Sequence, residues 1–243
     1  MSYVLILGAK SDIAKACARE YAKNGYDLML AGRSISELND FATDLEVRCS
    51  QKIELIELDI LKTNSHLSFY QSLSEKPLGV ISAIGLLGNQ SKAQDDFDHA
   101  QTLINTNFTA IVSLLSIIAN DFEQRKSGFI VGISSVAGDR GRKSNYIYGA
   151  AKAGLSAYLS GLRNRLTSSQ VHVMTVKPGF VATQMTKNMD LPEKLTAQPR
   201  EVAQHIFKAQ QSHKNCIYSK WQWRYILLII RSIPEFIFKK LNL

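Results

Sequence analysis

The chain has 243 residues, enough to bury the core of one α/β domain of ordinary size. Apolar residues make up 45% of it and charged residues 21%, which excludes an intrinsically disordered chain. The net charge of +8 leaves two interpretations open, a surface that binds anionic partners and a charge that only maintains solubility.

Short apolar runs alternate along the chain with longer amphipathic stretches. The apolar runs predict strands at 3–8, 27–33, 52–60, 78–85, 128–135, 171–179 and 216–219. The amphipathic stretches predict helices at 13–24, 34–45, 65–74, 98–122, 145–168 and 200–211. This alternation predicts an α/β fold, a doubly wound parallel sheet of about seven strands with helices on both faces.

No repeat or low-complexity linker divides residues 1–219, which we expect to form one domain. Residues 220–243, KWQWRYILLIIRSIPEFIFKKLNL, form a C-terminal extension in which Pro234 separates two expected short helices. The apolar run from Tyr225 to Ile230 is far shorter than the about 20 residues that span a bilayer. Two interpretations stay open: the extension lies in a membrane interface with Lys239 and Lys240 toward anionic headgroups, or its apolar side covers the substrate cleft or a subunit interface.

The three cysteines, Cys17, Cys49 and Cys216, are odd in number and scattered. None has the spacing of a metal or redox motif, so we expect a reducing compartment and no metal site. The first residues, MSYVLILGAK, have no basic region before a short apolar run, and we interpret them as a strand rather than a signal peptide. The sequence has no basic run with interleaved aromatics, and we expect no nucleic-acid partner.

The segment LGAKSDIAKA joins the first expected strand to the first expected helix. In this context, backbone N–H groups and the helix dipole attract a pyrophosphate. The residues expected to bind it are Gly8, Lys10, Ser11, Asp12 and Ile13. Asp12 can cap the helix, although its negative charge would lie near the phosphates. The alternative is an ordinary strand–helix turn.

The second expected strand is followed by Arg33 and Ser34. An NAD site usually needs an acidic residue at this position, to bond the ribose 2′-hydroxyl. An arginine with no carboxylate beside it suits a 2′-phosphate instead, because the guanidinium forms paired hydrogen bonds to phosphate oxygens. We therefore expect NADP(H) to be favoured over NAD(H). The alternative is a solvated Arg33 in a loop.

From residue 3 to about residue 219 the sequence resembles the short-chain dehydrogenase/reductase family. The matching residues occur in the family's order: Gly8, Asp59-Ile60, Gly85, Asn107, Ser135, Tyr148, Lys152, Pro178-Gly179 and Thr183. Two features depart from the family pattern. Asp12 and Ala14 replace the last two glycines of the phosphate turn, and only Gly85 is kept of the family's Asn-Asn-Ala-Gly turn.

The resemblance implies a Rossmann-type fold and an NAD(P)-dependent oxidoreductase that assembles as a homo-dimer or homo-tetramer. It also implies cofactor contacts from Asp59, Ile60, Gly85, Tyr148, Lys152, Pro178, Gly179, Val181 and Thr183. A Tyr-xxx-Lys pair alone is weak support, since chance often supplies one in a chain with 9 tyrosines.

Tyr148 and Lys152 are four residues apart and share one helical face. A nearby ammonium and a bound nicotinamide cation would lower the tyrosine pKa, which is ordinarily about 10. Tyr148 can then hand a proton to a carbonyl oxygen while hydride arrives at carbon. The resemblance implies that Ser135 holds the carbonyl oxygen, Asn107 positions a water and Lys152 bonds the nicotinamide ribose. The alternatives are a partly buried helix face and, for Asn107, a residue that distorts its helix.

The loop between Ser135 and Tyr148 contains Arg140, Arg142 and Lys143, which we expect to border the substrate cleft. Such a basic lip can hold a phosphodiester; the alternative is an exposed charged loop. The run SSVAGDRGRKSNYIYGAAKAG locally resembles the ketoreductase of polyprenyl-phosphate pentose epimerisation. That resemblance implies a keto-sugar that carries a lipid or a phosphate.

The sequence thus predicts a cytoplasmic, NADPH-dependent carbonyl reductase or alcohol dehydrogenase, placed at the inner face of the membrane if the extension binds lipid. Its expected substrate is a small-molecule or lipid-linked carbonyl compound. Two other classes of protein stay open: a non-catalytic regulatory or scaffold protein that binds NADP(H), and a peripheral membrane adaptor built on residues 220–243.

Overall fold

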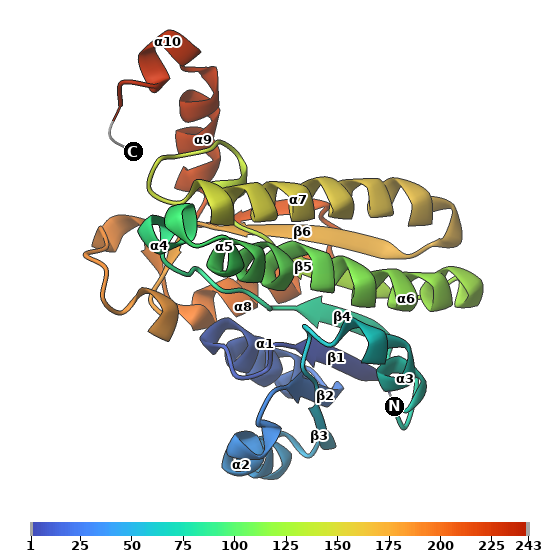
Figure 1. The fold of residues 1–243 in the computed structure, drawn as a ribbon. Helices are drawn as coiled ribbons and strands as arrows, with labels where there is room; N and C mark the ends of the chain where they lie inside the picture. Colours follow the sequence, from blue (N-terminus) through green and yellow to red (C-terminus); the bar gives the residue numbers. More distant parts are fainter. Residues whose placement is uncertain (1, 242–243) are drawn as a thin grey trace.

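A computed structural model describes residues 2–241 of the chain (Figure 1). The strands are β1 (Tyr3–Leu7), β2 (Asp27–Gly32), β3 (Ile53–Glu57), β4 (Gly79–Ser82), β5 (Phe129–Ile133), β6 (His172–Pro178), β7 (Phe180–Val181), β8 (Thr196–Ala197) and β9 (Cys216–Ser219). The helices are α1 (Asp12–Lys23), α2 (Asn39–Cys49), α3 (His66–Gln71), α4 (Gln90–Asp95), α5 (Phe97–Ile104), α6 (Ala110–Arg125), α7 (Tyr146–Leu166), α8 (Pro199–Gln211), α9 (Gln222–Ser232) and α10 (Glu235–Phe238).

Within residues 2–241, seven strands pair in the order β3-β2-β1-β4-β5-β6-β9, and every pairing is parallel. The chain moves outward from β1 to β3 and then crosses to β4 on the other side of β1. In such a sheet, ligands bind beyond the carboxyl ends of the strands where the order reverses. The predicted doubly wound α/β fold is confirmed.

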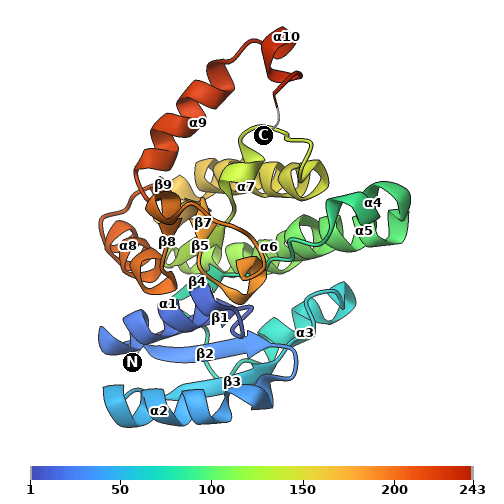
Figure 2. The same cartoon turned by 90° about the vertical axis from the view of Figure 1, so that its left-hand side faces the viewer.

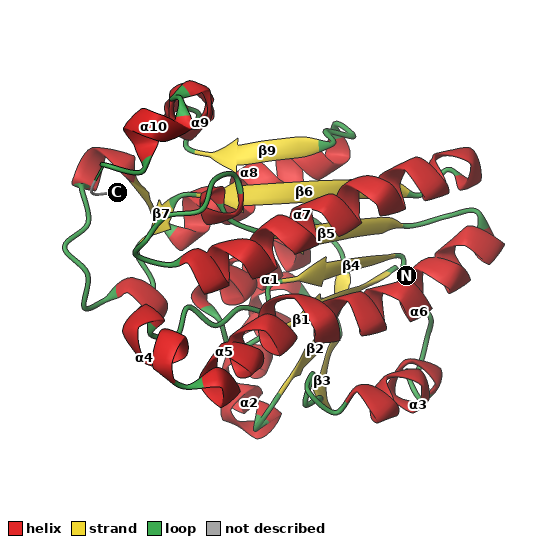
Figure 3. Cartoon of the chain, turned by 45° about the horizontal axis from the view of Figure 1, so that its top comes forward, coloured by secondary structure: helices red, strands yellow, loops and turns green. Residues whose placement is uncertain are grey.

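Helices cover both faces of this sheet (Figure 3). Along β1, Val4 and Ile6 join the core that α1, α2 and α8 cover, whereas Leu5 and Leu7 join the core under α3, α6 and α7. Because both faces are buried, the central strands are apolar at successive positions rather than at alternate ones.

The helical stretch Phe97–Arg125 consists of α5, a π-helical turn at Asn105–Thr109 and α6. Among the described residues, it is the stretch that is long and apolar enough to cross a membrane by length and composition alone, and 44% of its apolar window is buried. Leu114 and Ile118 pack on the sheet, so the stretch is apolar because it covers the core. A single helix was expected at 98–122. This prediction was wrong in one respect, because the π turn at Asn105–Thr109 interrupts the helix.

Several expected boundaries were also wrong at the carboxyl ends of strands. β3 stops at Glu57, and β4 stops at Ser82. The residues that follow each of them form loops of the functional site. The expected helix at 34–45 begins as a 3-10 turn, Ile35–Leu38, and continues as α2. The sequence also missed α4 and the two-stranded pairing of β7 with β8, which are too short to show a periodicity.

The two helices predicted near the C-terminus are present and project from the layered body (Figures 1 and 2). Trp223 and Leu227, on the inner side of α9, are buried in a cluster with Val136. The outer side exposes large apolar side chains, namely Trp221, Tyr225, Leu228 and Ile229. The helix α9 therefore has two apolar sides, one buried against the body and one exposed.

Candidate active site

Loops at the carboxyl ends of the strands surround two adjoining cavities. We call the first, of about 320 Å³, the Tyr148 pocket, and the second, of about 300 Å³, the Arg33 pocket. The two share five lining residues, Lys10, Ser11, Ala83, Ile84 and Gly85. Together they form one groove across the ends of the strands, at the point where the strand order reverses.

The site residues expected from the sequence divide between these pockets. Those that line the Tyr148 pocket are Lys10, Ser11, Asp12, Ile13, Gly85, Ser135, Tyr148, Lys152, Pro178, Gly179, Val181 and Thr183. Those that line the Arg33 pocket are Gly8, Lys10, Ser11, Arg33, Asp59, Ile60 and Gly85. Asn107 is fully buried and lines neither pocket.

The turn between β1 and α1 brings backbone close to the groove. Gly8 has a φ of +76°, and a side chain there would lie 3.1 Å from the carbonyl of Ala83. Ser11 is the N-cap of α1, and its hydroxyl accepts a hydrogen bond from the Ala14 N–H at 3.2 Å. The expectation that Asp12 caps the helix was therefore wrong, because Ser11 holds that position.

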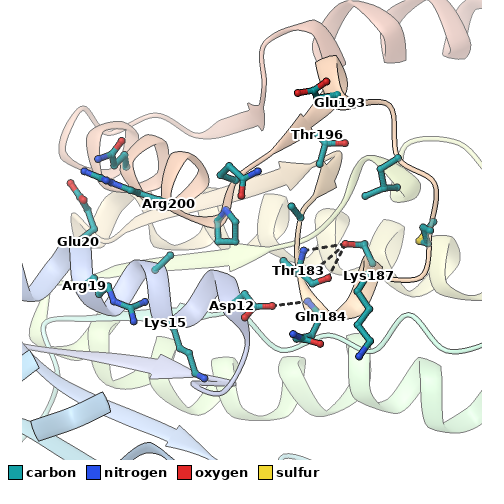
Figure 4. Close-up of a pocket in the computed structure, with 18 of the residues that line it drawn as sticks. Asp12, Lys15, Arg19, Glu20, Thr183, Gln184, Lys187, Glu193, Thr196 and Arg200 are labelled. Carbon is teal, nitrogen blue, oxygen red and sulfur yellow. Dashed lines mark hydrogen bonds between the residues drawn. The ribbon is translucent and has the colours of Figure 1, made fainter. Parts of the chain in front are cut away.

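Asp12 instead binds the loop that follows β7. Its Oδ2 accepts a hydrogen bond from the backbone N–H of Gln184 at 2.8 Å (Figure 4). This contact joins the first turn of α1 to the segment 182–196, which links β7 to its partner strand β8. The carboxylate thus holds the loop that closes the groove near Thr183.

Lys152 is buried beneath the Tyr148 pocket, with 2% of its surface exposed. Its Nζ donates hydrogen bonds to the carbonyl oxygens of Ile133 at 3.0 Å and Ile84 at 3.3 Å, and lies 5.9 Å from the centre of the Tyr148 ring. Burial lowers the pKa of Lys152 to about 7. Burial also raises the pKa of Tyr148 to about 12, and the Ser135 hydroxyl opposes that shift. Tyr148 therefore carries its proton at neutral pH.

Two adjacent serines follow β5 and act differently. The Ser135 hydroxyl lies at the pocket wall and accepts a hydrogen bond from the Ala137 N–H at 3.1 Å. The buried Ser134 donates to the carbonyl of Lys152 at 2.9 Å and bonds the hydroxyl of Ser156 at 2.8 Å. Ser134, which the sequence analysis did not single out, thereby anchors the first half of α7 against the end of the sheet.

Asn107 lies in the π turn and ties it to the loop after β4. Its amide donates to the carbonyls of Leu103 at 2.9 Å and Leu86 at 2.7 Å, and its Oδ1 accepts from the Leu86 N–H at 3.1 Å. A side chain at Gly85 would lie 3.5 Å from both Asn107 Oδ1 and Lys152 Nζ. The helix is thus distorted at Asn107, and the residue also comes close to the base of the site.

Arg33 is exposed at the wall of its pocket. No carboxylate lies beside Arg33 in the sequence. The expectation that none lies near it in the fold was wrong. Glu57, at the end of β3, accepts hydrogen bonds from the backbone N–H groups of Ser34 at 2.8 Å and Ile35 at 3.0 Å. These bonds lower the pKa of Glu57. The positive charge of Lys10 also lowers this pKa, by a smaller amount. The carboxylate is thus held in its charged form next to the Arg33 turn.

Several residues that line the Tyr148 pocket were not predicted from the sequence: Leu87, Asn145, Phe180, Met185, Met189 and Trp223. Trp223 comes from α9, and its indole N–H donates to the carbonyl of Leu195 at 3.1 Å. A side chain at Gly179 would overlap the indole ring, so the close approach requires glycine. The first turn of the extension therefore walls the pocket, which is one of the two interpretations left open for it.

The expected basic lip is divided among three different environments. Arg140 does not reach the pocket: its guanidinium donates to the carbonyl of Ile233 at 2.7 Å and pairs with Glu235 at 2.9 Å. Lys143 is exposed, and only Arg142 lines the Tyr148 pocket. The expectation that all three border the substrate cleft was wrong for Arg140, whose side chain holds the corner between α9 and α10, and for Lys143, whose side chain is exposed outside the pocket.

A wider, open groove of about 1240 Å³ lies on the other side of the segment 182–196, between α1 and the start of α8 (Figure 4). Side chains of both signs line it, among them Lys15, Arg19, Glu20, Glu193 and Arg200. It contains none of the Ser135, Tyr148 and Lys152 side chains, so its size does not make it the reaction site.

Residues 2–194 match the family model described as short chain dehydrogenase. An uncharacterized oxidoreductase of Mycobacterium tuberculosis (strain ATCC 25618 / H37Rv) is 34% identical over 241 residues, which cover 98% of this chain and 96% of that protein. A short-chain dehydrogenase from Sphingobium yanoikuyae, solved in complex with NADPH, superposes with a TM-score of 0.84 at 24% identity and covers 97% of each chain. One from Burkholderia cenocepacia J2315, in complex with NADP, has a TM-score of 0.84 at 17% identity and covers 100% of this chain and 98% of that one. At these identities, the two solved structures show a shared fold.

Proposed function

The chain belongs to the short-chain dehydrogenase/reductase family and is an oxidoreductase, and on that premise we propose that it reduces a carbonyl compound with NADPH. The observation that carries the proposal is the arrangement of Ser135, Tyr148 and Lys152, which meet at one end of the groove. These three residues are the catalytic set of the proposal, and Asn107 is a positioning residue behind them.

The groove fits the nicotinamide cofactor of this proposal. Gly8 lines the groove just before the N-terminus of α1, where the N–H groups of the first helical turn can bond a pyrophosphate. Arg33 would bind the 2′-phosphate, and it lines the same pocket as Asp59 and Ile60. Lys152 and Thr183 lie at the other end, where the nicotinamide ribose and amide would contact the protein.

Tyr148 acts as the general acid in this mechanism. Burial raises its pKa, so it carries at neutral pH the proton that the carbonyl oxygen needs. When bound, NADPH supplies the hydride. Ser135 orients the carbonyl oxygen, and Lys152 stabilises the tyrosinate left after proton transfer.

The finer proposal for the substrate is a keto-sugar or related carbonyl compound that carries a lipid or a phosphate. Its support is the apolar wall of the Tyr148 pocket together with the local resemblance around residues 134–154. The apolar outer face of α9 and the basic residues of the extension also suit contact with an anionic membrane. We propose a cytoplasmic enzyme that works at the inner face of the membrane.

The proposed organisation is a catalytic domain at 1–219 followed by the extension at 220–243. By analogy with the family, the proposed assembly is a homo-dimer or homo-tetramer. Light scattering measures this directly.

Replacement of Tyr148 tests the proposed activity. With ketones and keto-sugars that the wild type reduces, Tyr148→Phe should lower kcat by about 100-fold or more, because general acid catalysis contributes at least that much. NADPH consumption measures turnover, and fluorescence titration measures NADPH binding, which should be retained. Tyr146→Phe is the matched control, since Tyr146 is exposed on the same helix and outside both pockets.

Full turnover by Tyr148→Phe would contradict the catalytic assignment. Binding of NADPH without turnover of any carbonyl by the wild type would favour the non-catalytic regulatory role. Absence of binding to both NADPH and NADH would exclude the enzyme proposed here.

A further inference from the structure

Arg142 presents unpartnered hydrogen-bond donors to the Tyr148 pocket. It lies in the turn between β5 and α7, where its carbonyl accepts from the Asn145 N–H at 3.1 Å. Its Nε and Nη2 are shielded from solvent, yet they contact no hydrogen-bond acceptor within residues 2–241. A charged donor that has lost its water and gained no acceptor is costly, so the site favours a ligand that supplies one.

The neighbouring carboxylate does not neutralise Arg142. Asp139 attracts it, but Asp139 is bonded by Lys177 Nζ and accepts from the Tyr218 hydroxyl at 2.8 Å. Burial lowers the pKa of Arg142 below its ordinary range, with Asp139 opposing the shift. The positive charge of Arg142 is therefore left without a counter-ion of its own among the described residues.

Asn145 supplies a second, independent observation in the same pocket. It occupies the N-cap position of α7, where an asparagine side chain ordinarily accepts a helix N–H. Here Gln90 Oε1 accepts from the Ile147 N–H instead, at 3.1 Å. The Oδ1 of Asn145 is buried without a partner among residues 2–241, and the residue lines the pocket. Because this oxygen only accepts hydrogen bonds, it suits a hydroxyl of the ligand and not the anionic group itself.

Many of the other residues that line this pocket are apolar. Among them are Leu87, Val136, Phe180, Met185, Met189 and Trp223. A ligand that satisfies the whole surface therefore combines an anionic oxygen group with an apolar portion.

We propose that Arg142 binds a carboxylate or phosphate group on the carbonyl substrate, with Asn145 Oδ1 able to accept from a hydroxyl of the same substrate. The guanidinium matches either oxyanion through paired hydrogen bonds. This inference rests on the proposed function, because it assigns a substrate class to the same pocket. It makes Arg142 a substrate-binding residue, distinct from the three catalytic side chains.

A binding measurement without turnover tests the inference. The full-length protein, saturated with NADP⁺, is titrated with hexyl phosphate, hexanoate and 1-hexanol, and the shift of the unfolding temperature gives each affinity. The wild type should bind at least one of the two anions and bind hexanol more weakly. Arg142→Gln should weaken anion binding by about 10-fold or more, since charge-assisted hydrogen bonds are lost. Arg142→Lys keeps the positive charge but loses the paired hydrogen bonds of the guanidinium. Its anion affinity should therefore lie between those of the wild type and Arg142→Gln.

Lys143→Gln is the matched control, because it removes the same charge from an exposed position in the same turn. It should bind the anions as the wild type does. Binding of hexyl phosphate alone identifies the group as a phosphate, and binding of hexanoate alone identifies it as a carboxylate. Unchanged anion affinity in Arg142→Gln, equal affinity for hexanol, or no anion binding by the wild type would each overturn the inference.

Turnover separates this inference from the proposed function. The wild type should show a higher kcat/KM for dihydroxyacetone phosphate than for dihydroxyacetone, or for acetoacetate than for ethyl acetoacetate. Arg142→Gln should remove that preference mainly through KM. Anion binding through Arg142 without any carbonyl reduction would count against the reductase assignment. If kcat/KM depended neither on the anionic group of the substrate nor on the Arg142→Gln substitution, the result would count against this inference alone.

Discussion

Lys152 is a cation that the fold keeps almost entirely away from water. Its folded-state pKa, about 7, lies below the ordinary lysine value of 10.5. Between these values the unfolded chain binds more protons than the folded one, so the free energy of unfolding rises with pH in this window. The cost of this burial at neutral pH, on the order of a few kcal/mol, is consistent with selection for reactivity rather than stability.

The first prediction concerns this pH dependence. In urea unfolding of the cofactor-free protein, stability should rise from pH 7 to about 8, below the range where the unfolded-state thiol of Cys17 and the tyrosines titrate. Lys152→Met should flatten the rise, because it removes the titrating group. Lys143→Met should preserve it, since that lysine is exposed. A slope that survives Lys152→Met would mean that another group causes it.

The second prediction concerns Arg33 and the choice of cofactor. Arg33→Ala should raise the Kd of NADPH by about 10- to 100-fold and change that of NADH little, since only NADPH carries the 2′-phosphate. Glu57→Gln should tighten NADPH binding, because it removes the negative charge held beside the Arg33 turn. Fluorescence titration measures both constants. Arg48→Ala on α2, outside both pockets, is the control, and an equal loss for both cofactors would contradict the assignment.

At the scale of elements, the contact between Asp12 and Gln184 joins α1 to the segment 182–196. The resemblance to the family implies a glycine at position 12, and the contact with Gln184 gives the aspartate found there a structural role. The negative charge stays close to the phosphate turn, yet one oxygen is engaged by the loop. The third prediction therefore distinguishes the effect of the Asp12 charge from the effect of its hydrogen bond to Gln184.

Asp12→Ala should speed hydrogen exchange at the Gln184 amide and raise the substrate KM several-fold, because the loop loses its anchor. Asp12→Asn should keep slow exchange, since its amide oxygen can still accept, and should bind NADPH more tightly than the wild type. Exchange mass spectrometry and titration measure the two effects. Asp190→Ala, exposed in the same segment, should change neither. Equal exchange rates in Asp12→Ala and the wild type would show that the contact does not hold the loop.

At the scale of the whole molecule, one side of the extension forms part of the Tyr148 pocket wall and the other side is exposed on the surface. The inner side of α9 supplies Trp223 to the Tyr148 pocket, and Arg140 holds the corner before α10 through Ile233 and Glu235. The outer side exposes an apolar row, and residues 220–243 carry five basic side chains and one acidic. Clustered positive charge opposes self-association of this surface and favours an anionic lipid layer.

The fourth prediction is that the protein sediments with vesicles containing phosphatidylserine and much less with pure phosphatidylcholine vesicles. Leu228→Asp combined with Ile229→Asp should abolish sedimentation, because both side chains face outward. Val47→Asp, at an exposed apolar position on α2, is the control. High salt should weaken the binding. Vesicle binding that survives the double substitution would contradict the proposal, as would a dimer that dissociates only in the double variant.

The positions of the strands follow from local patterns, and the main site residues follow from motifs that resemble the family's. Apolar runs identified all seven strands of the large sheet, and the motif order along the chain placed Ser135, Tyr148 and Lys152 at its carboxyl edge. These features were predictable because they depend on side-chain periodicity and on short spacings. The π turn at Asn107 was not, since one extra residue in a helical turn leaves no mark in the apolar pattern.

The sequence by itself determined the doubly wound fold, the family and the residues available for chemistry. Tertiary structure alone decided which distant side chains meet. Asp12 bonds Gln184 across 172 positions, Glu57 lies beside the Arg33 turn, and Arg140 holds the extension while Arg142 faces the pocket. The physical reason is that such pairings depend on how strand crossovers and helix packing bring separate loops together, and local propensity carries no information about that.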